Sequence, residues 1–237
     1  MNDKEETETD AERVKRFADG AERIFVNAEA LYKEAELLGS AGHFARATVL
    51  HQISMEECSK IDTLGAAATS LLVGMEVDED RLSRAFRNHK AKNHANAYLA
   101  AIPEEEKAAM VRGDWETAHK AFKEFQKKFH EDVNATKNAG LYVDFENGQF
   151  TAPTDVINEQ TAIVFQRLNG FFLNHCKNFL KVLGRMVNEP DFYADFGKEI
   201  IARSKALCKS GDLDPAKIET KLITELLDKY KNEETPR

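Results

Sequence analysis

The chain has 237 residues, and its 41 acidic residues outnumber its 33 lysines and arginines, so the formal net charge is −8 with neutral histidines. This acidity excludes general attraction to nucleic acid, and any nucleic-acid site must be a local feature. No apolar run approaches the roughly 18 residues of a membrane helix, and the acidic N-terminus lacks the apolar region of a signal peptide. We therefore expect a cytoplasmic protein with no membrane partner.

The apolar residues predict a helical protein, and the small numbers of prolines (5) and glycines (12) agree. Residues 1–10 are acidic and polar, and we expect them to be disordered. From residue 11 to residue 237 we expect one helical domain, with a bundle core over residues 11–140. Spacings of three and four predict helices over residues 11–38, 42–74 and 115–139. Another helix, capped by Asp78 or Asp80, is predicted to continue without a break to about Ala101.

The pattern changes at residues 141–153, where apolar and polar residues alternate. Asn147-Gly148 is a strong turn signal, so we predict a short β-ribbon inserted between helices. Two interpretations stay open. The ribbon is either a loop packed over the bundle or an exposed edge, with Tyr142, Asp144 and Phe150, that pairs with a strand of another chain. Beyond the ribbon, residues 154–237 predict additional C-terminal helices, over residues 155–187, 191–209 and 214–231.

One stretch of this acidic sequence is strongly basic: residues 81–100 contain three arginines, two lysines, two histidines and no acid. On a continuous helix Arg87 and His94 nearly eclipse one another, and Arg84, Lys90 and Tyr98 lie close to the same face. Such a face is either a solvated surface or a site for a phosphodiester. Arginine binds phosphate, and histidine exchanges a proton near neutral pH.

His89 falls on the apolar side of the same helix, where we expect a buried or half-buried structural histidine. The alternative is that Arg84-x4-His89 forms the working pair, although a continuous helix places these two residues on different sides. An arginine–histidine pair can cleave RNA without a metal ion, with the ribose 2′-hydroxyl as nucleophile. We expect no metal and no other cofactor, because Glu116-x-x-His119 is a single copy of a pattern that di-iron bundles need twice.

These features together resemble the HEPN superfamily. Arg87-Asn88-x5-His94 fits its R-x4-6-H motif, in which a polar residue, often asparagine, follows the arginine. The sequence HFARATVLHQISMEECSKID resembles its second helix, which ends in E-E-x-x-K. The sequence AGLYVDFENGQFTAP resembles the ribbon of AbiV-type abortive infection proteins, a bacterial phage-defence branch. The resemblance extends over residues 14–165.

The resemblance implies an all-α, HEPN-like helical bundle that forms a homodimer, in which the motifs of two subunits meet at one RNA-cleaving site. Arg87 would stabilise the scissile phosphate, His94 would act as general acid or base, and Asn88 would orient the substrate. The RNA-binding residues would be Arg84, Lys90 and Tyr98. The E-E-x-x-K residues Glu56, Glu57 and Lys60 would support the site. Their simpler interpretation is a Glu56–Lys60 pair on a helix surface.

The implied function is phage defence by a toxin, a metal-independent ribonuclease that arrests translation once a phage-encoded protein activates it. A second hypothesis is a non-catalytic helical module that sequesters RNA, a protein of the translation apparatus or a phage protein. The simplest hypothesis is a helical scaffold without toxicity.

Overall fold

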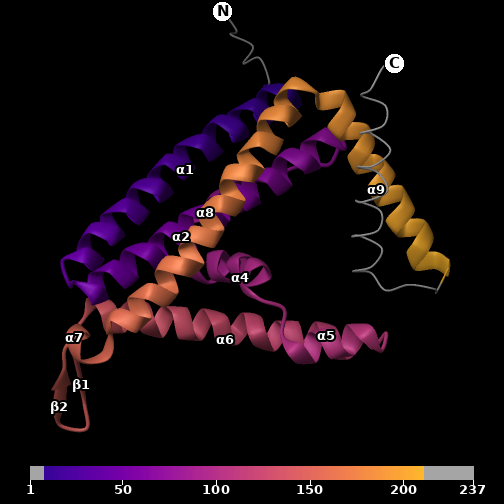
Figure 1. Ribbon diagram of the computed structural model, residues 1–237. Coiled ribbons are helices and arrows are strands. Elements are labelled where there is room, and N and C mark those ends of the chain that lie inside the picture. The colour runs from indigo at the N-terminus through magenta and orange to yellow at the C-terminus, as the bar shows by residue number, and fades with distance from the viewer. Residues whose placement is uncertain (1–7, 211–237) are drawn as a thin grey trace, which may run out of the picture.

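The computed structural model describes residues 8–210, so the predicted disorder of residues 1–7 and the predicted helix over residues 214–231 lie outside it. Within that range the chain is helical, as predicted, apart from one two-stranded ribbon. Three long helices lie side by side (Figure 1): α1 (Asp10–Ser40), α2 (Phe44–Leu72) and α8 (Glu159–Asn188). The other elements are α3 (Glu79–Arg87), α4 (His89–Ala100), α5 (Glu104–Val111), α6 (Trp115–Leu141), β1 (Asp144–Glu146), β2 (Gln149–Thr151), α7 (Pro153–Val156) and α9 (Pro190–Ser210).

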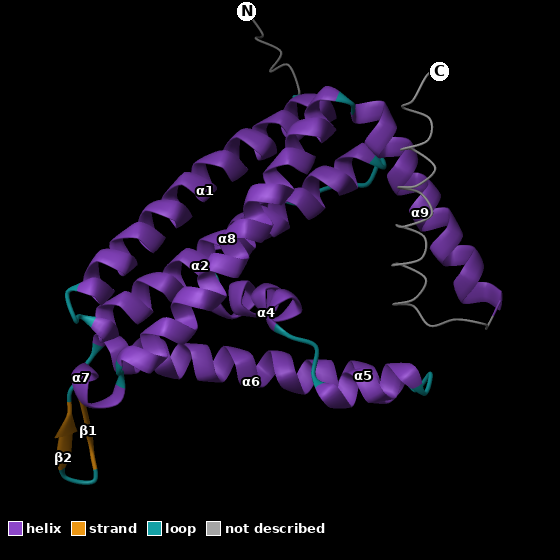
Figure 2. Ribbon diagram, viewed as in Figure 1, coloured by secondary structure: helices purple, strands orange, loops and turns teal. Residues whose placement is uncertain are grey.

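The helix α2 is the centre of the bundle, because α1 and α8 pack on it from one side and α4 and α6 from another (Figure 2). The apolar core lies between α1, α2 and α8. Its fully buried side chains include Met55 and Ile61 of α2 and Phe172 and Leu183 of α8. None of the helices within residues 8–210 combines the length and the hydropathy that crossing a membrane requires.

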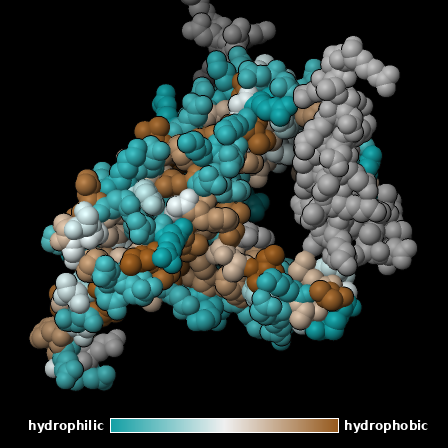
Figure 3. Space-filling model, in the orientation of Figure 1, coloured by the Kyte–Doolittle hydropathy of each residue, from teal (hydrophilic) through white to brown (hydrophobic). Residues whose placement is uncertain are grey.

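The predicted ribbon is an antiparallel hairpin of β1 and β2. Its turn residues Asn147 and Gly148 have positive φ angles of 52° and 78°, as a type I′ turn requires. The hairpin projects beyond the end of α6 and carries hydrophobic as well as hydrophilic residues (Figures 1 and 3). Phe145 is 60% and Phe150 77% exposed. The interpretation of the ribbon as a loop packed over the bundle is therefore wrong.

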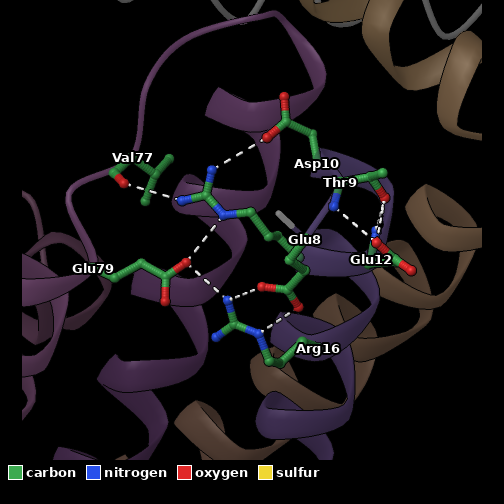
Figure 4. A network of polar contacts seen from close by, with 8 residues as sticks. Glu8, Thr9, Asp10, Glu12, Arg16, Val77 and Glu79 are labelled. Atoms are coloured by element: carbon green, nitrogen blue, oxygen red, sulfur yellow. Dashed lines mark hydrogen bonds and ion pairs between the residues drawn. The ribbon is translucent and has the colours of Figure 1, made fainter. Parts of the chain in front are cut away.

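The start of α3 is tied to the start of α1 by a network of charged side chains (Figure 4). Thr9 caps α1, and Glu12 accepts a hydrogen bond from the Thr9 backbone N–H (2.8 Å). Arg13 and Arg16 of α1 both bind Glu79, the first residue of α3, at 3.0 and 2.8 Å. The helix α1 thus begins at Asp10, inside the segment predicted to be disordered. The network also fixes the position of the start of α3, where the basic stretch begins.

The helices α2 and α8 approach closely at Gly65, where an added Cβ would lie 2.1 Å from Cε1 of Phe179. We expect Gly65→Ala to lower the free energy of unfolding by about 1–3 kcal/mol, because the Phe179 ring must move in a packed core. Gly184→Ala in α8 is the matched control. Its added Cβ meets no atom within 4 Å, and it should raise stability by about 0.5–1 kcal/mol through helix propensity. Thermal unfolding followed by circular dichroism measures the stability of both variants. If their unfolding temperatures shifted in the same direction, the close packing at Gly65 would be contradicted.

His51 of α2 is buried close to α1 and α8. The Asn169 side-chain nitrogen lies 3.3 Å from its Nδ1, and the Ser54 hydroxyl lies within hydrogen-bond distance of both Asn169 and the Ala28 carbonyl. Burial lowers the pKa of His51 to about 4. The folded chain therefore holds this histidine neutral at pH values where the unfolded chain protonates it.

The unfolded state consequently binds more protons than the folded state between pH 4, the folded pKa, and about 6.5, the unfolded one. We therefore expect the free energy of unfolding to be unaffected by His51 above this pH window and to decrease as the pH falls through it. The decrease should reach about 3 kcal/mol at pH 4. His51→Gln should flatten this part of the curve of unfolding free energy against pH. The exposed His43 provides the control, His43→Gln, which should leave the slope unchanged. An unaltered slope in His51→Gln would assign the pH dependence to another group.

Candidate functional site

The basic stretch forms two helices. The first, α3, ends at Arg87 and the second, α4, begins at His89, with Asn88 extended between them (φ −97°, ψ 105°). The Asn88 side chain accepts a hydrogen bond from the backbone N–H of Ala91 (3.2 Å) and so caps α4. Asparagine favours this position because its side chain competes with the helix for backbone groups. The prediction of one unbroken helix to about Ala101 is therefore wrong.

This break separates the two residues that were expected to stack on one edge. Arg87 is exposed and donates a hydrogen bond to the Ser83 hydroxyl (2.7 Å), one turn earlier in α3. His94 lies on α4 with its ring centroid 5.9 Å from that of His130 on α6. In the part of the chain that the structure describes, no hydrogen bond or ion pair joins Arg87 to His94. Their expected alignment along a single rod is wrong.

The ring of His94 is poorly placed to exchange protons with a ligand. Its Nε2 is buried and has no hydrogen-bond partner among the described residues. Burial, assisted by the positive charges of Lys90, His130 and Lys123, lowers the pKa of His94. The ring is therefore neutral at neutral pH and packed between α4 and α6.

His89 is in the opposite situation. Its side chain is 59% exposed, and its Nδ1 lies 2.6 Å from Oε2 of Glu56 on α2. The expectation of a buried or half-buried structural histidine is thus wrong for the ring itself. An ionised carboxylate can only accept hydrogen bonds, so at this contact the His89 ring donates from Nδ1.

Glu56 is a buried carboxylate that receives donors from two other helices. Lys92 of α4 lies 2.7 Å from one of its oxygens, and Lys137 of α6 lies 2.8 Å from the other. Burial alone would raise the pKa of the Glu56 carboxyl, but the hydrogen bonds from Lys137, Lys92 and His89 outweigh it, and the pKa is lowered. Glu56 is therefore ionised at neutral pH. We call Glu56, His89, Lys92 and Lys137 the Glu56 cluster.

The expected surface pair of Glu56 and Lys60 is not present. Lys60 instead pairs with Glu57, three residues before it, and its ammonium lies 5.8 Å from the centre of the Phe86 ring. Sequence reasoning missed the true partners Lys92 and Lys137. A signal existed for Lys137, because it follows Val133 by four residues and so falls on the buried stripe of α6.

The remaining cations of the basic stretch face solvent. Arg81, Arg84, Arg87 and Lys90 are all exposed, and Arg84 makes one distant ion pair with Asp78 (3.7 Å). The side chain of Tyr98 lies outside the described part of the structure. Together with the two lysines that share one carboxylate, these residues give the site an excess of positive charge. Such a site can bind an anion and exchange a proton through the His89 ring.

Among residues 8–210, no group of three or more histidine, cysteine, aspartate or glutamate side chains is arranged to hold a metal ion. That range includes Glu116 and His119. Chemistry without a metal remains a prediction.

A helical bundle whose basic stretch carries R-x4-6-H spacings is the architecture of a HEPN-type domain. Residues 16–174 match the family AbiV of HEPN domains, and the chain belongs to that family. The family predicted from the motifs is confirmed. The matched segment contains the whole Glu56 cluster and both arginine–histidine registers.

A curated relative shares part of this segment. The uncharacterized protein y4gJ of Sinorhizobium fredii (strain NBRC 101917 / NGR234) is 38% identical over 111 residues, which are 46% of this chain and 57% of y4gJ. The match thus spans little more than half of that relative. No solved structure matches the chain.

The Glu56 cluster predicts an unequal effect of two neighbouring substitutions. Glu56→Gln leaves two buried ammonium groups without a carboxylate, and we expect it to lower the free energy of unfolding by about 3–5 kcal/mol. Glu57→Gln removes the carboxylate of a single pair whose side chains are 14% and 18% exposed, and it should cost less, about 1–2 kcal/mol. Adding Lys137→Met to Glu56→Gln should restore part of the loss by removing one unpaired charge. Urea denaturation at pH 7 measures all three, and equal losses for the two single variants would contradict the cluster.

Proposed function

We propose that the chain is an abortive-infection protein that cleaves RNA without a metal ion and thereby arrests translation in a phage-infected cell. Its membership of the AbiV family supports the defence role. The observation that carries the cleavage is the 2.6 Å contact between the exposed His89 ring and the buried Glu56 carboxylate. It favours the Arg84-x4-His89 register over the pair of Arg87 and His94.

The proposed reaction uses the ribose 2′-hydroxyl as nucleophile. Nε2 of His89 accepts the proton of this hydroxyl, and the 2′-oxygen forms a bond to the adjacent phosphorus. The bond from phosphorus to the 5′-oxygen breaks, and that oxygen takes up the proton from the His89 imidazolium, directly or through a water molecule, which returns the ring to its starting state. The products are a 2′,3′-cyclic phosphate and a 5′-hydroxyl end. Glu56 holds the ring through Nδ1 and stabilises the imidazolium that forms.

The exposed cations Arg84, Arg87 and Lys90 are the proposed contacts for the RNA backbone. Their guanidinium and ammonium groups match phosphate oxygens and offset the negative charge that develops on phosphorus. A homodimer would bring two such sets to one RNA, as the R-x4-6-H motifs of HEPN nucleases imply. Activation by a phage-encoded protein belongs to the same proposal.

Substitution of single histidines separates the two registers. We expect His89→Ala to slow RNA cleavage in EDTA by at least about 100-fold, because general acid–base catalysis contributes that much or more. His94→Ala should keep the rate within a few-fold if it folds, and the exposed His119 on α6 supplies a matched control, His119→Ala. The measurement is the rate of appearance of 2′,3′-cyclic phosphate ends, with thermal unfolding of each variant as a check on folding.

Two outcomes would overturn this assignment. Full activity of His89→Ala, or loss of wild-type activity in EDTA, would remove the proposed chemistry. Tight binding of RNA that stays intact, together with growth arrest that survives His89→Ala, would decide for the non-catalytic binding module.

A further inference from the structure

The hairpin of β1 and β2 concentrates exposed apolar surface. Twelve large hydrophobic residues are exposed within residues 8–210, and five of them fall between residues 142 and 156: Tyr142, Val143, Phe145, Phe150 and Val156. The rings of Phe145 and Phe150 lie together, with centroids 4.6 Å apart. Contiguous apolar patches on soluble proteins mark interaction surfaces. A hairpin with three-residue strands is also marginal when alone, so it gains from being covered.

The register of the hairpin decides which backbone groups are free. Glu146 and Gln149 flank the two-residue turn, and in such a hairpin this first pair exchanges both backbone hydrogen bonds. The next pair, Phe145 and Phe150, is therefore the non-hydrogen-bonded one. Its N–H and C=O groups point away from the partner strand. Each edge of the hairpin thus offers one free donor and one free acceptor at its central phenylalanine.

The two edges differ in charge. On β1 the central Phe145 stands between two acidic residues, Asp144 and Glu146. Antiparallel pairing of β1 with a second β1 would set acid opposite acid, which is destabilising. On β2 the central Phe150 stands between Gln149 and Thr151, which are uncharged. Pairing of β2 with a second β2 would set glutamine opposite threonine, and both side chains donate and accept hydrogen bonds.

We propose that β2 pairs with β2 of a second copy of this chain, across a two-fold axis that passes beside Phe150. The two phenylalanines at position 150 exchange their free N–H and C=O groups, and the result is a four-stranded sheet with the order β1-β2-β2-β1. The four rings from positions 145 and 150 form one apolar face of that sheet. A second copy is the partner that fits, because the β2 edge is complementary to itself and its pairing places no like charges opposite one another.

This contact is small, because three-residue strands give only two central hydrogen bonds across the axis. Interfaces that are stable alone bury about 1,200 Å² or more. The sheet therefore forms at high protein concentration or adds to a larger contact elsewhere. It involves none of the Glu56 cluster, so it is independent of the proposed RNA cleavage.

Disulfide cross-linking tests the register directly. Phe150→Cys is placed in a Cys208→Ser background, so that the other cysteines are the buried Cys58 and Cys176. It should form a covalent dimer on mild oxidation, because residues opposed across a hydrogen-bonded pair have Cα atoms about 5.5 Å apart. Phe145→Cys in the same background is the matched control. In the proposed sheet residue 145 lies three strand spacings, or about 14 Å, from its counterpart, so this variant should form no covalent dimer. Equal cross-linking of the two variants, or none of Phe150→Cys, would overturn the proposal.

Light scattering across a range of concentrations gives a second measurement, without a covalent trap. We expect Phe150→Asp to reduce the average mass at high concentration, while Phe171→Asp, at an exposed phenylalanine of α8, leaves it unchanged. Phe150→Pro should act like Phe150→Asp because it removes the outward N–H, whereas Phe150→Leu should keep most of the association. The proposed sheet would be contradicted if Phe171→Asp reduced the average mass as much as Phe150→Asp, or if Phe150→Asp kept the average mass of the wild type. The cross-link should form equally well in His89→Ala, so failure of the cleavage proposal leaves this test intact.

Discussion

A carboxylate taken out of water must be matched by donors that are fixed in place, and Glu56 is matched by donors from α4 and α6. The arrangement of the basic stretch depends on this requirement. His89 and Lys92 are three residues apart and so share a face of α4, and both point at the same carboxylate. That contact fixes the rotation of α4 against α2. It also turns the next residues of the face, Asn93 and Asn96, into the bundle, where both are buried.

The two sides of α2 are held by different forces. Toward α1 and α8 its contacts are mainly apolar, with the hydrogen bonds of His51 and Ser54 among them, and burial of the apolar surface supplies most of the stability. Toward α4 and α6 its contacts include the ion pairs of Glu56 with Lys92 and Lys137 and the hydrogen bond from the Asn96 amide to the Met55 carbonyl. Buried ion pairs add little net stability, because the cost of removing the charges from water offsets their attraction. The polar side therefore specifies how α4 docks more than it stabilises the bundle.

This division explains what the sequence could and could not predict. Apolar spacing gave the long helices, and Asn147-Gly148 gave the hairpin, because both signals act between near neighbours in the chain. The break at Asn88 was missed because a continuous helix through it also has an apolar face, with Leu82 and Phe86 turned to the core. The donors of Glu56 were missed because they are 33 to 81 residues away from it. Only tertiary packing brings them together.

The cap at Asn88 has a consequence for the chemistry of the stretch. On one unbroken helix His89 would turn toward the apolar side, and its ring would be buried with Phe86. The extended backbone at Asn88 lets α4 start in a new direction, so His89 becomes its first residue and contacts the Glu56 carboxylate while its ring stays in solvent.

The basic stretch thereby divides its cations between two tasks. Lys92 and Nδ1 of His89 are committed to Glu56, which fixes the position of the ring. Arg81, Arg84, Arg87 and Lys90 stay exposed to solvent. An acidic chain repels RNA over most of its surface, so the proposed RNA contact depends on these few exposed cations acting together. In the proposed homodimer a second copy would present the same cations and double the local charge without a change of sequence elsewhere, which is the physical advantage that a two-fold axis would give such a site.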